Sequence, residues 1–179
     1  GLNLGEAAAY LVLESSAAAS GKKVLAYLSG YGNTNDAHHQ TASSPDGTGA
    51  FMAMQKALEI SNLSPAQIQY VNAHGTATPN NDLSESVALQ RLFGDLMPYV
   101  SSTKGFTGHT LAAAGAVEAV FSVLMLQEQS IFPNLNFKTA MPETGLVPVT
   151  RVTAATLKNV LSNSFGFGGN CASLIFNTA

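Results

Sequence analysis

The sequence is poor in charged side chains. Only 11% of its 179 residues are Asp, Glu, Lys or Arg, with 8 basic against 11 acidic, whereas an ordinary soluble domain has about 25%. The net charge of -3 and the scattered basic residues argue against a nucleic-acid-binding surface. Such a chain either buries much of itself between layers or presents a large surface to a partner.

Cysteine is nearly absent, and several catalytic patterns are missing with it. The single Cys171 excludes an internal disulfide framework and a cysteine-rich metal site. There is no Gly-x-Ser-x-Gly nucleophile elbow and no readable Ser-His-Asp triad. The glycines in 166–169 lie between predicted strands, which does not favour a dinucleotide site. His74 and His109 lack a third ligand in a metal-binding pattern.

Long hydrophobic runs are also missing. The longest, residues 112–126, is interrupted by Glu118 and is too short to span a bilayer. The N-terminus has no basic region followed by an apolar stretch, so no signal peptide is predicted. The chain opens at Gly1 directly before a predicted strand, and we interpret it as a fragment of a longer chain.

Strand-like and helix-like patterns alternate along the chain, which is typical of an α/β fold. Period-two or compact apolar runs predict strands at 7–14, 23–31, 68–73, 100–102, 158–164 and 172–177, with a further candidate at 149–152. Helical spacing predicts helices at 50–60, 82–93 and 111–127. Residues 33–49 and 132–148 are predicted to be irregular.

A single mixed α/β domain over 1–179 follows from these patterns. The last two predicted strands are joined by a short glycine-rich turn, so they should pair antiparallel. The helix at 111–127 is apolar nearly all round, and we expect it to be buried on more than one side. There is no internal repeat and no interdomain linker.

Three polar loops carry the functional candidates: 72–79, 101–109 and 163–169. Two of them directly follow predicted strands and the third joins the last two strands. Open α/β sheets place their sites at the carboxyl ends of strands. We therefore expect these loops to meet at one edge of the sheet.

The loops carry two histidines and a lysine. His74 follows its strand beside Gly75, and His109 precedes the helix at 111–127, whose positive end should keep the imidazole neutral. A neutral imidazole can donate a hydrogen bond to an oxygen on which negative charge develops. Lys104 could reach Glu85 or Glu118. Spacing alone leaves open that both histidines are structural, and it names no reaction.

Other polar groups in and near these loops have simpler interpretations. Thr76 and Thr78 supply two hydroxyl groups to the first loop. His38 and His39, in the long loop, are predicted to be solvated.

Together the three loops resemble motifs of the β-ketoacyl-acyl-carrier-protein synthases, especially the elongating synthase II type. VNAHGTATP resembles the first histidine motif, SSTKGFTGHTLAAAGAVEA the lysine and second histidine motif, and LSNSFGFGGNCASLIF the glycine-rich C-terminal motif. GEAAAYLVLE and NDAHHQTASSPDGTGA also look familial. The resemblance covers the whole chain, but only the C-terminal half of such an enzyme.

The resemblance implies the C-terminal half of a thiolase-like fold, a mixed five-stranded sheet with helices on both faces. It implies a decarboxylative Claisen condensation in fatty-acid or polyketide synthesis, in which an acyl thioester on a cysteine of the N-terminal half is attacked by decarboxylated malonyl-carrier protein. The chain alone would lack that nucleophile and be inactive. No cofactor of its own is implied, since the phosphopantetheine arm of acyl carrier protein carries the substrate.

The resemblance also implies roles for particular residues. His74 and His109 would bind the malonyl thioester carbonyl, and Lys104 would be the active-site lysine. Phe167 would be the gate, with its N–H group in the acyl oxyanion hole. The supporting acidic residues would be Asp82, Glu85 and Glu118, and the phosphopantetheine-binding residues Thr76 and Thr78. The positions that surround a buried monovalent cation in some members are Asn72, Glu118, Ser162 and Asn163.

The implied partners are acyl carrier protein, the N-terminal half of the same enzyme and, in the intact enzyme, a second copy in a homodimer. The implied compartment is the cytoplasm. No membrane or nucleic acid is implied. One alternative is a non-catalytic chain-length-factor-like subunit, which both histidines and the lysine disfavour.

The chain departs from the family pattern near its end. It reads Gly-Gly-Asn-Cys where the family usually has Gly-Gly-Thr-Asn, so Cys171 takes the place of an asparagine. We interpret Cys171 as a small buried residue of a strand. Thiolases use a C-terminal cysteine, but their partner motif is Asn-His-Gly rather than His-Gly-Thr, and thiolase is therefore rejected.

Overall fold

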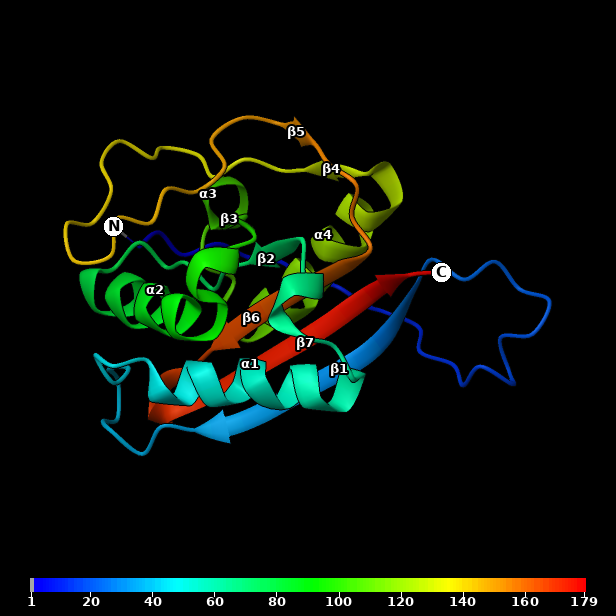
Figure 1. Cartoon of the computed structure of the whole chain (residues 1–179), viewed down its shortest axis with the longest axis horizontal. Helices are drawn as coiled ribbons and strands as arrows, with labels where there is room; N and C mark the ends of the chain where they lie inside the picture. The colour runs from blue at the N-terminus through cyan, green and yellow to red at the C-terminus, as the bar shows by residue number, and fades with distance from the viewer. Residues whose placement is uncertain (1) are drawn as a thin grey trace.

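The computed structural model describes residues 2–179, and its centre is a five-stranded sheet (Figure 1). The strand order is β1-β7-β6-β2-β3. The strands are β1 (Ala26–Asn35), β2 (Tyr70–Asn72), β3 (Tyr99–Ser101), β6 (Asn159–Phe165) and β7 (Asn170–Thr178). A separate two-stranded pair consists of β4 (Ser130–Ile131) and β5 (Thr153–Ala154).

The sheet is mixed, as predicted. β2 pairs in parallel with both β3 and β6, whereas β7 is antiparallel to β6 and to β1. The predicted antiparallel pairing of the last two strands is thus confirmed. The carboxyl ends of β2, β3 and β6 consequently share one edge of the sheet, and the loops that follow them meet there.

Helices cover both faces of the sheet. Helices α1 (Thr48–Ser61) and α2 (Pro79–Phe93) pack on one face and α4 (Ala114–Glu128) on the other (Figure 1). The short helix α3 (Lys104–Thr107) follows β3. Single 3-10 turns complete the set: η1 (Pro65–Gln67), η2 (Gly94–Leu96), η3 (Leu111–Ala113) and η4 (Phe167–Gly169).

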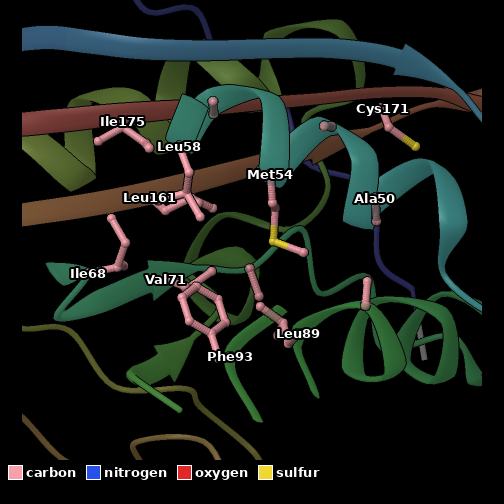
Figure 2. Close-up of a cluster of buried hydrophobic side chains, with 14 of the residues drawn as sticks. Ala50, Met54, Leu58, Ile68, Val71, Leu89, Phe93, Leu161, Cys171 and Ile175 are labelled. Atoms are coloured by element: carbon pink, nitrogen blue, oxygen red, sulfur yellow. The ribbon is translucent and has the colours of Figure 1, made fainter. Parts of the chain in front are cut away.

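Two hydrophobic clusters follow from the alternation of side chains along the strands. In β2, Val71 faces the cluster under α1 and α2, while Tyr70 faces the cluster under α4. Figure 2 shows the first cluster, where Met54 of α1 and Leu89 of α2 lie between the two helices and the sheet. Cys171 lies at the margin of this cluster and is buried, as predicted.

The predicted strand at 7–14 is not formed. These residues adopt no regular structure, and Tyr10, Val12 and Leu13 are exposed by 92%, 90% and 69%. The pattern was strand-like, but a strand is stabilised by pairing, and no other described segment lies alongside to pair with it.

The predicted strand at 149–152 is also wrong. Val149 donates one backbone hydrogen bond to the Val100 carbonyl at the edge of β3, and its own carbonyl accepts one from Asn134. Regular pairing starts only at Thr153, in β5. One hydrogen bond to β3 keeps this stretch beside the sheet without making it a strand.

The predicted helix at 111–127 starts later and is less buried than expected. Residues 111–113 form η3, and α4 begins at Ala114. Its buried side chains lie on one face, whereas Leu124 on the other is 43% exposed. Within residues 2–179, Leu111–Glu128 is the one stretch long and apolar enough for a membrane span by length and composition alone. Because α4 packs on the sheet and buries Glu118, we interpret it as a core helix.

Candidate active site at the carboxyl edge of the sheet

The two histidines meet at the carboxyl edge of the sheet. His74 follows β2 and is buried, and His109 lies between α3 and η3 and is partly exposed. Their ring centroids are 5.2 Å apart and the rings are nearly perpendicular, at 83°. The predicted convergence of the two imidazoles is confirmed, and both can address one small group.

Glu85 fixes the backbone of the loop that carries His74. Its two carboxylate oxygens accept the N–H groups of His74 and Gly75, both at 2.9 Å. Asn163 of β6 donates a third hydrogen bond to the same carboxylate at 3.1 Å. Burial raises the pKa of Glu85, while these three donors oppose the rise. Glu85 therefore supports the site through the loop backbone rather than by pairing with Lys104.

Lys104 is buried and bridges the site to α4. Its Nζ forms an ion pair with Glu118 and lies 3.2 Å from His74 Nδ1. Of the two partners that the sequence left open for Lys104, Glu85 and Glu118, the structure pairs it with Glu118. An ammonium group can only donate hydrogen bonds, so Nδ1 of His74 must accept and its proton must be on Nε2.

The electrostatics of the buried site favour a neutral His74. Its pKa is lowered from 6.5 to about 2, mainly by burial and then by the neighbouring Lys104 and His109. Burial also raises the pKa of Glu118 to about 7, against the opposing effect of Lys104. At neutral pH His74 is thus an uncharged hydrogen-bond donor beside a cation.

The lowered pKa of His109 also favours the neutral imidazole. Its pKa is lowered by burial and then by Lys104. The helical stretch after His109 begins with η3 at Leu111 and continues directly into α4, and the contribution of its positive end stays a prediction. The Leu111 N–H group donates to His109 Nδ1 at 3.1 Å. This contact places the proton of His109 on Nε2, as in His74.

A cavity of about 960 Å³ is lined in part by His109 and by Ala73 and Gly75, the neighbours of His74 in the chain. Its wall includes Thr76, Asp82 and Lys104, and the irregular segment that contains Leu135 and Met141 covers it. The hydroxyl groups of Thr76 and Thr78 lie 2.9 Å apart, although Thr78 is outside the cavity lining. Burial raises the pKa of Asp82, which lies in the first turn of α2.

Phe165, which the sequence analysis missed, is an aromatic residue in contact with His74. Its ring centroid lies 5.6 Å from that of His74. Phe167, the predicted gate, is 80% exposed. Its loop is held by a hydrogen bond from the Gly168 N–H group to the Gln40 carbonyl, at 2.7 Å. The two phenylalanines are two residues apart in one motif, and only their burial distinguishes them.

The four positions of the implied cation site are partly brought together. Asn72 and Ser162 are register partners in neighbouring strands, and Asn72 donates to the Glu118 backbone carbonyl at 3.3 Å. Asn72 Oδ1 is buried without a hydrogen-bond partner, whereas Asn163 Oδ1 accepts from Ser173 at 2.7 Å. Among residues 2–179, no three His, Cys, Asp or Glu side chains form a metal-binding group.

Solved structures identify the class of fold. The chain superposes with a TM-score of 0.94 and 35% identity on the ishigamide ketosynthase/chain length factor, covering 100% of this chain and 45% of that one. It also superposes on a β-ketoacyl synthase from Burkholderia phymatum STM815, with a TM-score of 0.82, 38% identity and coverage of 91% and 40%. The fold is therefore the thiolase fold of the ketosynthases, as predicted.

Sequence comparisons narrow this class to a family. The model of the β-ketoacyl synthase C-terminal domain matches residues 25–138. The 3-oxoacyl-[acyl-carrier-protein] synthase 2 of Staphylococcus aureus is 42% identical over 181 residues, which cover 98% of this chain and 45% of the relative. The mitochondrial synthase of Arabidopsis thaliana is 44% identical, with coverage of 98% and 40%. The chain belongs to the β-ketoacyl synthase family and carries its C-terminal domain.

The chain spans about half the length of these relatives. A further solved structure, at a TM-score of 0.89 and 32% identity, is a type II polyketide synthase acyl-carrier protein in complex with its ketosynthase bound to the hexaketide. That ketosynthase works with an acyl carrier protein.

Proposed function

We propose that this chain supplies the decarboxylating half of a 3-oxoacyl-[acyl-carrier-protein] synthase. The observation that carries the proposal is the pair of neutral imidazoles: His74 and His109 lie 5.2 Å apart, and each has its Nδ1 occupied as an acceptor. Each ring therefore offers an Nε2–H group. Two such donors directed at one oxygen stabilise the negative charge that develops on it.

The reaction that uses two such donors is the decarboxylation of a malonyl thioester. The bond between C2 and the carboxylate breaks and carbon dioxide leaves. The electron pair moves onto the thioester oxygen, where His74 and His109 donate their hydrogen bonds. The resulting enolate attacks the acyl thioester through C2, a C–C bond forms, and the thiolate of the nucleophilic cysteine departs.

Lys104 acts on this step through His74. Its ammonium group donates to His74 Nδ1, so the Nε2–H tautomer is the one present when substrate arrives. Burial lowers the pKa of both histidines, and the positive charge of Lys104 lowers it further. A protonated imidazole would serve equally as a donor but would remove the hydrogen bond from Lys104 and charge the buried site.

The nucleophile, the carrier protein and the dimer partner belong to the intact enzyme. We place the acyl-accepting cysteine in the half of the synthase that this chain does not contain, since Cys171 is buried and its pKa is raised to about 12. The phosphopantetheine arm of acyl carrier protein would reach the histidines past Thr76 and Thr78. Phe167 would gate the acyl side, because its exposed ring lies on the loop after β6.

A buried monovalent cation is compatible with one feature of the site. Asn72 Oδ1 has no partner and is the oxygen that such an ion would take. When bound, the ion would add a positive charge to the buried site. Asn163 Oδ1 is already engaged by Ser173, so it fits the ion less well.

The chain-length-factor alternative is less well supported. A subunit that only binds and scaffolds has no need for two neutral histidine donors and a buried lysine that sets the tautomer of one of them. The presence of all three favours a condensing enzyme.

The test is the His109→Ala variant of the full-length synthase. Decarboxylation of the malonyl thioester should fall about 100- to 1000-fold, because one oxyanion donor is lost. Loading of the acyl group onto the nucleophile should be unaffected. The control is His38→Ala, since His38 is exposed on another loop. Normal decarboxylation by His109→Ala would refute the role.

A further inference from the structure

The backbone around His109 has little regular structure of its own. His109 lies after α3 and before η3, so neither helix includes it. Gly108 before it has φ of +69° and Leu111 after it has φ of +55°. A positive φ at leucine is uncommon and persists only where neighbouring structure enforces it. Something outside this stretch must therefore hold His109 in place.

Residues 3–5, which we call the strap, hold it by both of its backbone groups. The His109 N–H group donates to the Asn3 carbonyl at 2.7 Å, and the His109 carbonyl accepts from the Gly5 N–H group at 3.1 Å. Leu4 between them is the parallel bridge partner of His109. The strap thus pairs with one residue as a neighbouring strand would.

The strap fits so closely that only glycine can take its last position. A Cβ atom at Gly5 would lie 1.9 Å from the Thr107 carbonyl oxygen, far inside van der Waals contact. A Cβ atom at Gly108 would lie 3.0 Å from the Gly5 nitrogen and 3.1 Å from the Asn3 oxygen. Gly5 of the strap and Gly108 of the loop before His109 therefore lie next to one another, and there is no room for a Cβ atom at Gly5.

We infer that the strap is a positioning element for His109 in the decarboxylation step, an inference that rests on the proposed function. The ring of His109 is fixed by the Leu111 N–H group, and its backbone is fixed by the strap. The strap lies outside residues 25–138, the part that the family's C-terminal domain model matches. His109 is thus placed by a segment that precedes the domain in the chain.

The Gly5→Ala variant of the full-length synthase tests this inference. The methyl group must displace the strap, and misplacement of a reacting group by about 1 Å lowers rates about 100-fold. Decarboxylation should fall by that order while acyl loading stays unchanged. Leu4→Ala is the matched control, because the Leu4 side chain is 68% exposed and the backbone hydrogen bonds of the strap remain.

A second variant removes one hydrogen bond and adds no atom. Replacing the Gly5 amide by an ester, with glycolic acid at position 5, deletes the N–H group that the His109 carbonyl accepts. Decarboxylation should then fall about 3- to 10-fold, the effect of one net hydrogen bond. In the same variant, amide hydrogen exchange at His109 should become faster, a readout that does not depend on activity.

The outcomes separate the strap from the proposed function. Wild-type decarboxylation rates in both variants would overturn the inference, and so would equal losses of loading and decarboxylation with a lower melting temperature, since these indicate a general structural role. Failure of the wild-type enzyme to decarboxylate any malonyl thioester would instead refute the proposed function. The exchange measurement at His109 would still decide whether the strap holds this residue.

Discussion

At the scale of single residues, the site depends on keeping an imidazole uncharged while it lies next to an ammonium group. His74 is buried and contacts Lys104, and Lys104 in turn pairs with Glu118. A buried charge without a partner is costly, so loss of either Lys104 or Glu118 would leave the other as an unpaired buried charge. Each of the three residues therefore constrains the protonation of the others.

This arrangement predicts a specific pH dependence of stability. Because the pKa of His74 is lowered from 6.5 to about 2, the unfolded chain binds a proton between these values that the native chain does not. The free energy of unfolding should therefore fall as the pH drops below 6.5. Glu118, with its pKa raised from 4.5 to about 7, acts in the opposite direction between those two values.

Chemical denaturation of the wild type and His74→Gln at pH 6.5 and 4.5 isolates the contribution of His74 to the pH dependence of stability, because Glu118 is present in both proteins. Between these two pH values, the free energy of unfolding of the wild type should fall by up to about 2–3 kcal/mol more than that of the variant. The control, His38→Gln, replaces an exposed histidine and should follow the wild type. Equal pH dependence in the wild type and His74→Gln would show that His74 has the same pKa in the native and unfolded states, and would contradict the prediction.

At the scale of elements, the contact between β1 and α1 shows why glycine occurs in a strand. Gly30 and Gly32 face α1, and a Cβ atom at Gly32 would lie 1.9 Å from the Ala53 carbonyl oxygen. The helix backbone thus lies directly on the strand backbone. The small residues Ala53 and Ala57 of α1 complete this close approach.

The Gly32→Ala variant should therefore be destabilised by about 1–3 kcal/mol or more, because α1 must move away from the sheet. Gly166→Ala is the matched control, since its φ of -135° suits any residue and a Cβ atom there meets nothing closer than 4.0 Å. Urea unfolding of both variants measures the difference. A Gly32→Ala variant as stable as Gly166→Ala would mean that α1 lies farther from β1.

The sequence predicted elements well where local signals determine them. Helix α2 begins three residues before the predicted 82, at the proline in its first turn, and ends at the predicted Phe93. The prediction of a strand at 7–14 was wrong because the local pattern does not show whether a pairing partner is present.

In the site, motif order predicted that His74 and His109 meet. The strap was missed because hydrogen bonds between backbone groups require no particular side chain, apart from the glycine at Gly5.

At the scale of the whole molecule, the chain carries one side of an active site. Its two histidines and Lys104 follow strands at one edge of the sheet, with Lys104 at the start of α3. Its one cysteine, Cys171, is buried. Cys171 is 4% exposed, and burial and the neighbouring Asp36 raise its pKa to about 12. A thiol so disposed is a poor nucleophile.

The 179-residue chain alone should therefore show no condensing activity with acyl- and malonyl-carrier protein, whereas the full-length synthase should. The assay follows formation of the β-ketoacyl product. Cys171→Ser in the full-length enzyme should keep most of its activity, because the residue only fills space beneath α1. Turnover by the short chain that Cys171→Ser abolishes would identify Cys171 as the nucleophile and contradict the proposal.

The position of β7 has a consequence for how the chain folds as it is synthesised. β7 lies between β1 and β6, so β1, made more than a hundred residues earlier, has no neighbour in the sheet until Asn170–Thr178 emerges. Pairing over such a separation closes a long loop and is slow. Until then β1 and β6 present unpaired edges that can pair with other chains. A ribosome that stalls before Asn170 would thus release a chain prone to aggregate, however complete its catalytic loops.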